Sequence, residues 1–114
     1  MRNKIDFVET DLNDLSCHTG VTFEVDILLT DYCSGIPNNL SGYSAMMLVY
    51  DVLESEDIIG ITGSIMEPEK GIINFHLSPT QTNTLDVGNY VHHIDISNNT
   101  NTYRICQGTF EVQE

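Results

Sequence analysis

Apolar and polar residues alternate strictly over Val21–Ile27, and this run constrains the fold of the chain more than any other feature of the sequence. An alternation with a period of two places one face of a strand on a core and the other in water. No stretch of about a dozen residues keeps the 3.6-residue apolar period of a helix. The sequence therefore predicts an all-β fold.

Similar short runs, rich in β-branched residues, recur along the chain between turn residues. Together they predict the strands Ile5–Glu9, Val21–Ile27, Tyr43–Leu53, Ile58–Met66, Ile72–Leu77, Asn89–Ile96 and Thr102–Val112. Seven antiparallel strands with regular turn signals are typical of a β-sandwich or small barrel, and 114 residues suit one domain over 1–114.

The segments between these strands carry their own predictions. Thr10–Gly20 is expected to be a polar connection and Glu67–Gly71 a hairpin turn. One short helical turn is expected over 79–84, with a serine as its N-cap and a proline at its first position. Gly60 and Gly63 indicate that their strand has a bulge or lies at an edge.

The charge of the chain disfavours several classes of partner. Four Lys and Arg residues stand against 17 Asp and Glu residues, which gives a net charge of -13. Binding to nucleic acid or to an anionic membrane is disfavoured by such a charge. No apolar run reaches the length of a transmembrane helix, and no apolar region follows the basic residues at the start. We therefore expect synthesis in a reducing cytosol and no insertion into a membrane.

Cysteine and histidine residues do not form a metal-binding pattern. The three cysteines, Cys17, Cys33 and Cys106, include no Cys-x-x-Cys pair, so we expect free thiols. His92 and His93 are adjacent, and adjacent residues of a strand point to opposite faces. One of them is expected to face solvent and the other to be half-buried, and no metal site is predicted.

No catalytic motif is present, so we expect the protein not to be an enzyme and to need no cofactor. The acidic segments 11–14 and 54–57 could supply oxygen ligands to calcium, but neither follows the EF-hand pattern. We expect both to be solvated acidic turns.

The order of several short motifs resembles a known family. These motifs are LSGYSA at 40–45, GIINFHLS at 71–78, PTQTNTLDVGNY at 79–90, HIDI at 93–96 and RICQGTFEV at 104–112. Over residues 20–112 the chain is similar to small immunoglobulin-like proteins of tailed-bacteriophage structural gene clusters, which include the N-terminal domain of phage baseplate upper proteins. The resemblance implies an immunoglobulin-like β-sandwich.

This resemblance suggests roles for particular residues. Leu85 would close one end of the sandwich, and Gly88 would take a positive φ in the following turn. Tyr90 would place its hydroxyl near that corner, as in a tyrosine corner. Gly108 would mark a bulge or a close backbone contact in the last strand, which ends near Phe110.

The function implied is that of a non-enzymatic structural protein of a tailed-phage virion, at the tail, neck, baseplate or capsid surface. Such a protein would bind other virion proteins in multiple copies. Since no receptor-binding tail follows Glu114, we expect a stand-alone module. The alternative is an adhesin-like module that holds a host-surface glycan through its Asn-rich loops, among them the loop at 97–101.

The N-terminal segment is a candidate for assembly. Arg2 and Lys4 are half of the basic residues of the chain, and they lie beside Ile5, Phe7 and Val8. A strand of this composition would either close its own sheet or add to an edge of a neighbouring subunit.

Overall fold

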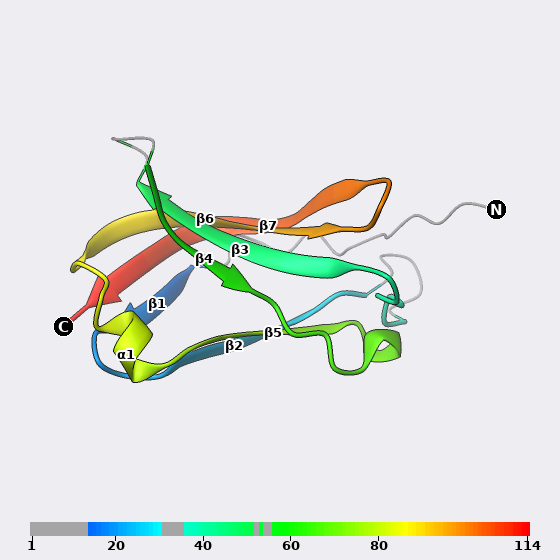
Figure 1. Ribbon diagram of the computed structural model, residues 1–114, viewed down its shortest axis with the longest axis horizontal. Coiled ribbons are helices and arrows are strands. Elements are labelled where there is room, and N and C mark those ends of the chain that lie inside the picture. Colours follow the sequence, from blue (N-terminus) through cyan, green and yellow to red (C-terminus); the bar gives the residue numbers. More distant parts are fainter. Residues whose placement is uncertain (1–13, 31–35, 52, 54–55) are drawn as a thin grey trace.

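The protein is a sandwich of two β-sheets in a computed structural model that describes residues 14–30, 36–51, 53 and 56–114 (Figure 1). The larger sheet has the strand order β1-β7-β6-β3-β4, and the smaller has the order β2-β5. The larger sheet consists of β1 (Leu15–His18), β7 (Thr102–Gln113), β6 (Gly88–Ser97), β3 (Ser44–Asp51) and β4 (Glu56–Thr62). The smaller sheet consists of β2 (Phe23–Leu28) and β5 (Ile72–Leu77).

The strand pairing identifies the architecture. All pairs are antiparallel except β1 and β7, which run parallel. The larger sheet is built on β3, β6 and β7 with added edge strands, and it faces a second sheet that contains β2 and β5. This arrangement is that of an immunoglobulin-like sandwich. The prediction of an all-β sandwich is confirmed.

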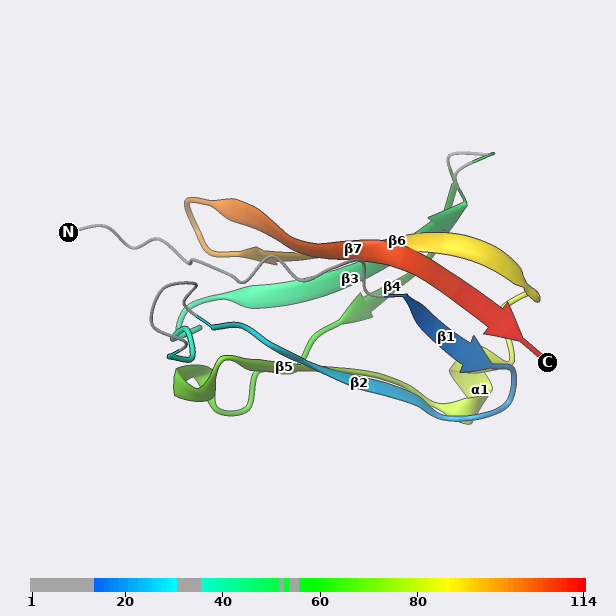
Figure 2. The ribbon, with the colours of Figure 1, turned by 180° about the vertical axis from the view of Figure 1, so that it is seen from behind.

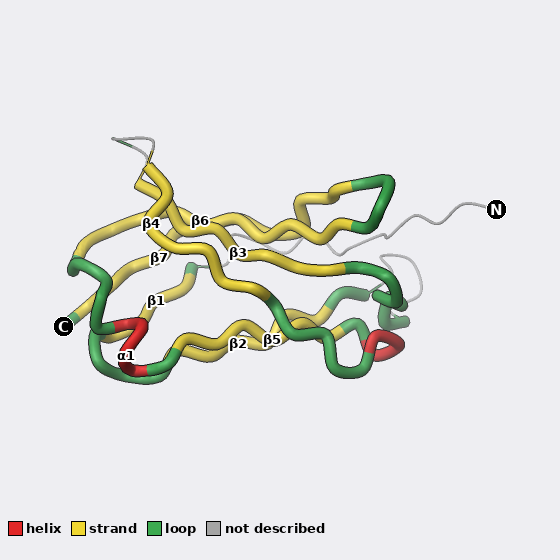
Figure 3. The backbone as a smooth tube through the Cα atoms, viewed as in Figure 1, coloured by secondary structure: helices red, strands yellow, loops and turns green. Residues whose placement is uncertain are grey.

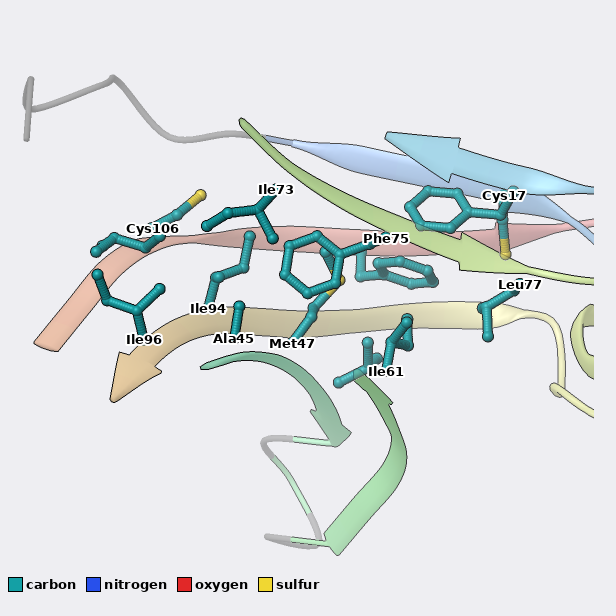
Figure 4. Close-up of a cluster of buried hydrophobic side chains, with 14 of the residues drawn as sticks. Cys17, Ala45, Met47, Ile61, Ile73, Phe75, Leu77, Ile94, Ile96 and Cys106 are labelled. Carbon is teal, nitrogen blue, oxygen red and sulfur yellow. The ribbon is translucent and has the colours of Figure 1, made fainter. Parts of the chain in front are cut away.

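The core lies between the sheets and is filled by alternate residues of each strand. Figure 4 shows Ile73 and Phe75 of β5 close to Ala45, Met47 and Ile94 of the larger sheet. All five side chains are at most 3% exposed. This burial explains why the alternating runs of the sequence locate the strands well, because each run has one face that must leave water.

Gly63 directly follows β4, at the start of the connection to β5, and packs against core side chains. A Cβ atom on Gly63 would lie 2.7 Å from Ile73, 2.9 Å from Ala45 and 2.9 Å from Phe75. A side chain therefore cannot be placed here without moving the core. The predicted edge position is confirmed, since β4 is the outer strand of the larger sheet.

The segment Glu67–Gly71 is not the hairpin turn that its composition predicts. It contains the 3-10 helix η1 (Pro68–Lys70), which ends at Gly71 with a φ of 67°. The strands on either side of it, β4 and β5, belong to different sheets and are not paired as a hairpin. Composition identified a turn correctly but could not show that the chain changes sheets.

Strand β1 is a second correction, because Leu15–His18 falls inside the predicted polar connection Thr10–Gly20. Leu15 and Cys17 point inward, and the residues between and after them are exposed. Four residues are too few for a clear alternation. The strand exists because it pairs with Phe110–Gln113 of β7. The predicted first strand, Ile5–Glu9, lies outside the described residues.

A short helix, α1 (Pro79–Thr82), confirms the predicted helical turn. Ser78 and Gln81 form a reciprocal capping box, with bonds of 3.2 and 2.8 Å. Helices α1 and η1 lie at opposite ends of the smaller sheet (Figure 3). Among the described helices, none has the length and apolar character needed to cross a membrane.

Candidate interaction surface

A tyrosine corner closes the end of the sandwich where β6 begins. The Tyr90 hydroxyl donates a hydrogen bond of 2.9 Å to the Asp86 carbonyl oxygen, four residues upstream. Leu85, one residue earlier, is 7% exposed and belongs to the core. The predicted positions of Leu85 and of the Tyr90 hydroxyl agree with the structure. The corner fixes the connection from α1 to β6.

The predicted reason for Gly88 is wrong. The described glycines with positive φ are Gly20, Gly42 and Gly71, and Gly88 is not among them. Gly88 is instead the first residue of β6, where it pairs with Val112. A Cβ atom at this position would lie 3.3 Å from the Tyr90 hydroxyl oxygen. The glycine therefore leaves room for the tyrosine corner, and no special backbone angle is involved.

A buried polar group lies beside this corner on the inner face of β6. His92 is 1% exposed, and its Nδ1 donates to the Thr109 carbonyl oxygen at 3.0 Å. With the proton on Nδ1, Nε2 is an acceptor and lies 3.9 Å from Cys106 Sγ. Burial lowers the pKa of His92, so the ring is neutral near pH 7.

Gly108 lies in β7 and is the cross-strand partner of His92 in β6. The register shift in the β6–β7 ladder lies between Ile94 and Asp95, so the predicted bulge is not at Gly108. The predicted close backbone contact at Gly108 stays a prediction.

The buried candidates do not form an exposed site. Phe110 is fully buried and packs edge-to-face on Phe23, with ring centroids 5.4 Å apart. Leu85 is also buried, so these two residues stabilise the sandwich and contact no partner directly. The remaining candidates, Ile5 and Phe7, lie outside the described residues.

The outer face of the larger sheet is the candidate surface for binding another protein. Met46 is 45% exposed there, and Leu48 and Tyr50 follow it along β3. Gly60 pairs with Leu48 but carries no side chain, and a Cβ on it would lie 3.5 Å from Met46 Sδ. At Gly60, β4 therefore contributes no side chain that would cover Met46 and Leu48 on the outer face.

A shallow depression of about 260 Å³ extends this face toward β7. Its lining residues are Tyr50, Val91, His92, Gln107, Gly108 and Thr109. The Tyr50 and His93 rings pack beside it, with centroids 5.4 Å apart. The depression and exposed Met46 lie on the same face of the larger sheet, four residues apart along β3. Such a face can accept side chains of a protein partner.

Charged groups border this surface on one side. Arg104 donates to Asp95 Oδ1 at 2.9 Å and to Oδ2 at 3.3 Å, and His93 Nδ1 lies 3.6 Å from Asp95 Oδ2. His93 is therefore packed against the outer face of the sheet, with a side chain 15% exposed. The expectation that His92 or His93 would face solvent is wrong, since His92 is buried and His93 is partly buried.

Neither of the segments weighed for calcium forms a described site. Asp14, the last residue of the segment 11–14, accepts a hydrogen bond of 2.8 Å from the Thr109 hydroxyl. The segment 54–57 falls largely outside the described residues. Within the part of the chain that the structure describes, no group of three or more His, Cys, Asp or Glu side chains is placed to hold a metal ion.

Cys17 and Cys106 are the described cysteines, and both are buried. Cys17 is a free thiol, whereas Cys33 lies outside the described residues. Burial raises the pKa of the Cys17 thiol. This thiol is therefore protonated at neutral pH and is a weak nucleophile.

The adhesin alternative requires Asn-rich loops. In the loop at 97–101 the side-chain amide of Asn98 forms hydrogen bonds within the loop itself. Asn98 Oδ1 accepts hydrogen bonds from the backbone N–H groups of Thr100 at 2.8 Å and Asn101 at 2.7 Å. This side chain shapes the β6–β7 hairpin and is not free to hold a sugar hydroxyl through that oxygen.

Comparison with known proteins supports the fold. No protein-family model matches the chain, and no curated protein matches it by sequence. The N-terminal domain of phage TP901-1 ORF48 aligns over 96% of both chains, with a TM-score of 0.56 and 12% identity. The chain and this phage domain therefore share a fold, as the motif resemblance implied.

Two further solved structures are more distant. An uncharacterized protein from Bacillus anthracis str. Ames aligns over 96% of this chain and 84% of its own, with a TM-score of 0.46 and 16% identity. The CupB6 tip adhesin from Pseudomonas aeruginosa aligns over 96% of this chain and 42% of its own, with a TM-score of 0.34 and 9% identity. At such TM-scores neither likeness supports a conclusion about function.

Proposed function

We propose that the protein is a non-enzymatic structural component of a tailed-phage particle and that it acts by binding other virion proteins. The observation that carries this proposal is the fold shared with the N-terminal domain of phage TP901-1 ORF48 over nearly all of both chains. The ordered motifs of the sequence point to the same class of protein. Both supports concern the whole domain and not one cluster of residues.

The outer face of the larger sheet is proposed as the contact with the particle. Met46, Leu48 and Tyr50 lie there on β3, and Tyr50 lines the depression, so a partner would bury apolar surface along the strand as well as a recess at one end of it. A single exposed apolar residue would be unremarkable on any protein. This face is proposed because it combines exposed apolar side chains along β3 with a recess.

Charge predicts the chemistry of the partner. The two described basic side chains are already paired, Lys70 with Glu67 and Arg104 with Asp95. The excess of carboxylates that gives the net charge of -13 is therefore left without Lys or Arg partners among the described residues. We expect a partner protein with exposed basic residues around an apolar centre, because complementary charge favours association.

The experiment has two parts, so that the particle role and the contact face are tested separately. First, phage particles from the producing culture are purified on a density gradient, and the protein is sought in them by mass spectrometry. Co-purification in a fixed ratio to other virion proteins is expected. Absence from intact particles overturns the proposal.

Second, Met46→Lys is compared with Leu28→Lys in particles that lack the wild-type protein. Leu28 is 55% exposed on the outer face of the smaller sheet, so it is a matched apolar position away from the proposed contact. Met46→Lys is expected to lower incorporation about tenfold, which corresponds to about 1.4 kcal/mol. Equal incorporation of both variants overturns the contact face and leaves the particle role standing.

The competing function, a module that binds a host-surface glycan, makes a different prediction. The isolated protein would then bind host-cell polysaccharide, and substitutions in the loop at 97–101 would abolish binding. We expect no such binding, because Asn98 Oδ1 is engaged within its own loop. A glycan that binds the isolated domain and is lost on Asn99→Ala would favour the adhesin.

A further inference from the structure

The outer face of the smaller sheet carries exposed apolar side chains. Leu28 of β2 and Ile72 of β5 are cross-strand partners, and they are 55% and 38% exposed. Both side chains point away from the core, because the neighbouring residues Ile27 and Ile73 pack into it. Figure 2 shows β2 and β5 together on the side of the molecule away from β3, β6 and β7. This apolar pair therefore lies on an outer surface of the sandwich.

Met66 extends this pair on the other side of β5. Backbone hydrogen bonds of 2.7 and 2.9 Å join Ser64 to Asn74 in an antiparallel bridge, so the chain after Ser64 runs toward the Ile72 end of β5. Ile65 packs against the core, and Met66 after it is 81% exposed. Three segments of the chain thus form one apolar row, which consists of Leu28, Ile72 and Met66.

Such a row differs from the scattered apolar residues found on any protein surface. Single exposed apolar side chains need no explanation, whereas apolar side chains gathered in one place mark sites of interaction. A partner that covers the apolar row would remove its area from water, which favours association. The row is therefore a candidate contact.

Two carboxylates lie next to the apolar row on the same face. The outward positions of β2 before Leu28 are Asp26 and Glu24, with a spacing of about 7 Å between successive positions. The Asn74 side-chain amide donates to Asp26 Oδ1 at 2.7 Å and to Glu24 Oε2 at 3.0 Å. This amide orders both carboxylates and neutralises neither charge.

The two described basic side chains are engaged elsewhere. Lys70 Nζ lies 2.9 Å from Glu67 Oε2, and Arg104 Nε lies 2.9 Å from an oxygen of Asp95. The carboxylates of Asp26 and Glu24 repel each other in the free protein. A cation supplied by a partner relieves this repulsion, and an arginine can bond to oxygens of both side chains.

We propose that the apolar row and this carboxylate pair form a second docking surface, which binds a segment of another protein that carries large apolar side chains beside Arg or Lys. The apolar side chains of the segment cover the row, and its cations lie over Asp26 and Glu24. Charge determines the class of occupant. A second copy would bring a net charge of -13 to an acidic face, and nucleic acid or an anionic membrane would be repelled as well.

The docking surface faces away from the proposed particle contact at Met46, because the two lie on the outer faces of opposite sheets (Figure 1). The protein can therefore bind two partners at once, and loss of the second contact leaves the first intact. The assignment of this surface does not depend on the proposed function, and it is tested on the isolated chain.

The test uses the purified full-length chain and a library of random peptides displayed on yeast. The chain is expected to enrich peptides that combine large apolar side chains with Arg or Lys. Enriched peptides are then synthesised, and their dissociation constants are measured by fluorescence anisotropy. Binding is expected to weaken as the salt concentration rises, because salt screens the charges.

Three variants locate the binding surface. Met66→Ser removes a side chain of the apolar row and is expected to weaken binding about tenfold. Asp26→Asn keeps an oxygen that accepts from Asn74 but removes a charge, and is expected to weaken binding about threefold or more. Leu53, which is 95% exposed in the turn between β3 and β4, supplies the matched control. Leu53→Ser is expected to change the dissociation constant less than about twofold.

The melting temperature separates a role in binding from a role in folding. Asp26→Asn is expected not to lower it, because the substitution removes the repulsion with Glu24. A weaker affinity together with a clearly lower melting temperature would make Asp26 a structural residue and overturn its assigned role.

Four further outcomes overturn the proposal. Enrichment of no peptide, or of peptides without basic residues, removes the proposed partner chemistry. Equal affinities of the wild-type chain and Met66→Ser show that charge alone attracts the peptides. Self-association of the isolated chain that Met66→Ser abolishes, measured by sedimentation, assigns the face to a second copy.

Discussion

The two sheets of the sandwich are stabilised in different ways. In the larger sheet, β3, β6 and β7 are hydrogen-bonded on both sides. In the smaller sheet, β2 and β5 pair with each other, and the described additions are two isolated bridges, Ser64 with Asn74 of β5 and Thr30, just after β2, with Pro37. A two-stranded sheet is marginal in water by itself. The smaller sheet is therefore held mainly by its side chains.

Contacts at the ends of the smaller sheet support this reading. Thr82, in the helix after β5, donates its hydroxyl to the Val21 carbonyl oxygen at 2.9 Å, just before β2. At the other end, Leu40 donates its N–H to the Pro68 carbonyl oxygen at 2.9 Å. Both hydrogen bonds fix a segment that leads into or out of a strand. The stability of the smaller sheet therefore depends on these connections and on the packing of the core.

The strongest test of this difference compares Phe75→Ala in β5 with Phe110→Ala in β7. Both side chains are fully buried, so each loss is expected to cost about 3–5 kcal/mol of unfolding free energy, measured by urea titration. In Phe75→Ala the amides of β2 and β5 should also exchange through a local opening. In Phe110→Ala the ladder of β7 should persist until the whole domain unfolds.

If the β5 amides of Phe75→Ala stay as protected as those of β6, the two sheets unfold together. That result would contradict the proposal that hydrogen bonds between strands stabilise the larger sheet and side-chain packing stabilises the smaller one.

The next test concerns the place where the chain leaves one sheet for the other. Gly63→Ala is expected to destabilise by about 1–3 kcal/mol, because the added Cβ meets three core side chains within 2.9 Å. Gly60→Ala, on the edge strand, is the matched control. Its Cβ would lie 3.5 Å from Met46 Sδ, an ordinary contact, so its unfolding midpoint should hardly change.

Thermal unfolding of both variants measures whether Gly63→Ala lowers the melting temperature more than Gly60→Ala does. Equal melting temperatures would mean that the sheets can separate slightly at Gly63 without losing core contacts.

The sequence predicts every described strand except β1, but for physical reasons it predicts the connections poorly. Ile72–Leu77 was predicted with the bounds that the structure shows, since its inner face is fully buried and its pattern is clean. Strand β1 was missed, because its four residues depend on a partner almost a hundred residues away. Local composition does not record such a partner.

The candidate surface was not predictable residue by residue. Met46 and Leu48 lie in a nearly continuous apolar run, and only the pairing of Leu48 with Gly60 shows that their face is uncovered. The role of Gly88 was misjudged for a related reason. A glycine before a strand suggests a turn, whereas the structure shows the Tyr90 side chain occupying the space.

A smaller effect is expected at the tyrosine corner, which belongs to the larger sheet and fixes its link to α1. Tyr90→Phe removes the donor to the Asp86 carbonyl oxygen and should cost about 1 kcal/mol of unfolding free energy. Urea titration measures the change. An unchanged unfolding free energy would show that water replaces the hydroxyl without loss, and that the corner does not stabilise the larger sheet.

The smallest expected effect comes from His92, whose polar ring is buried on the inner face of the larger sheet. Burial lowers its pKa in the folded state, so the unfolded chain takes up a proton there more readily. Stability is therefore retained above the ordinary histidine pKa of about 6.5 and decreases as the pH falls below it. His92→Asn keeps a donor near the Thr109 carbonyl oxygen but cannot titrate.

The measurement is the slope of unfolding free energy against pH between about 7.5 and 5.5, which brackets the ordinary histidine pKa. The slope should be smaller in His92→Asn than in the wild-type chain. Comparing slopes removes any constant loss caused by the substitution itself. If His92→Asn keeps the wild-type slope, His92 is protonated as easily inside the sandwich as outside it. Water would then reach the inner face of the larger sheet at His92. The two sheets would therefore differ in how tightly their inner faces are packed, as well as in their strand pairing.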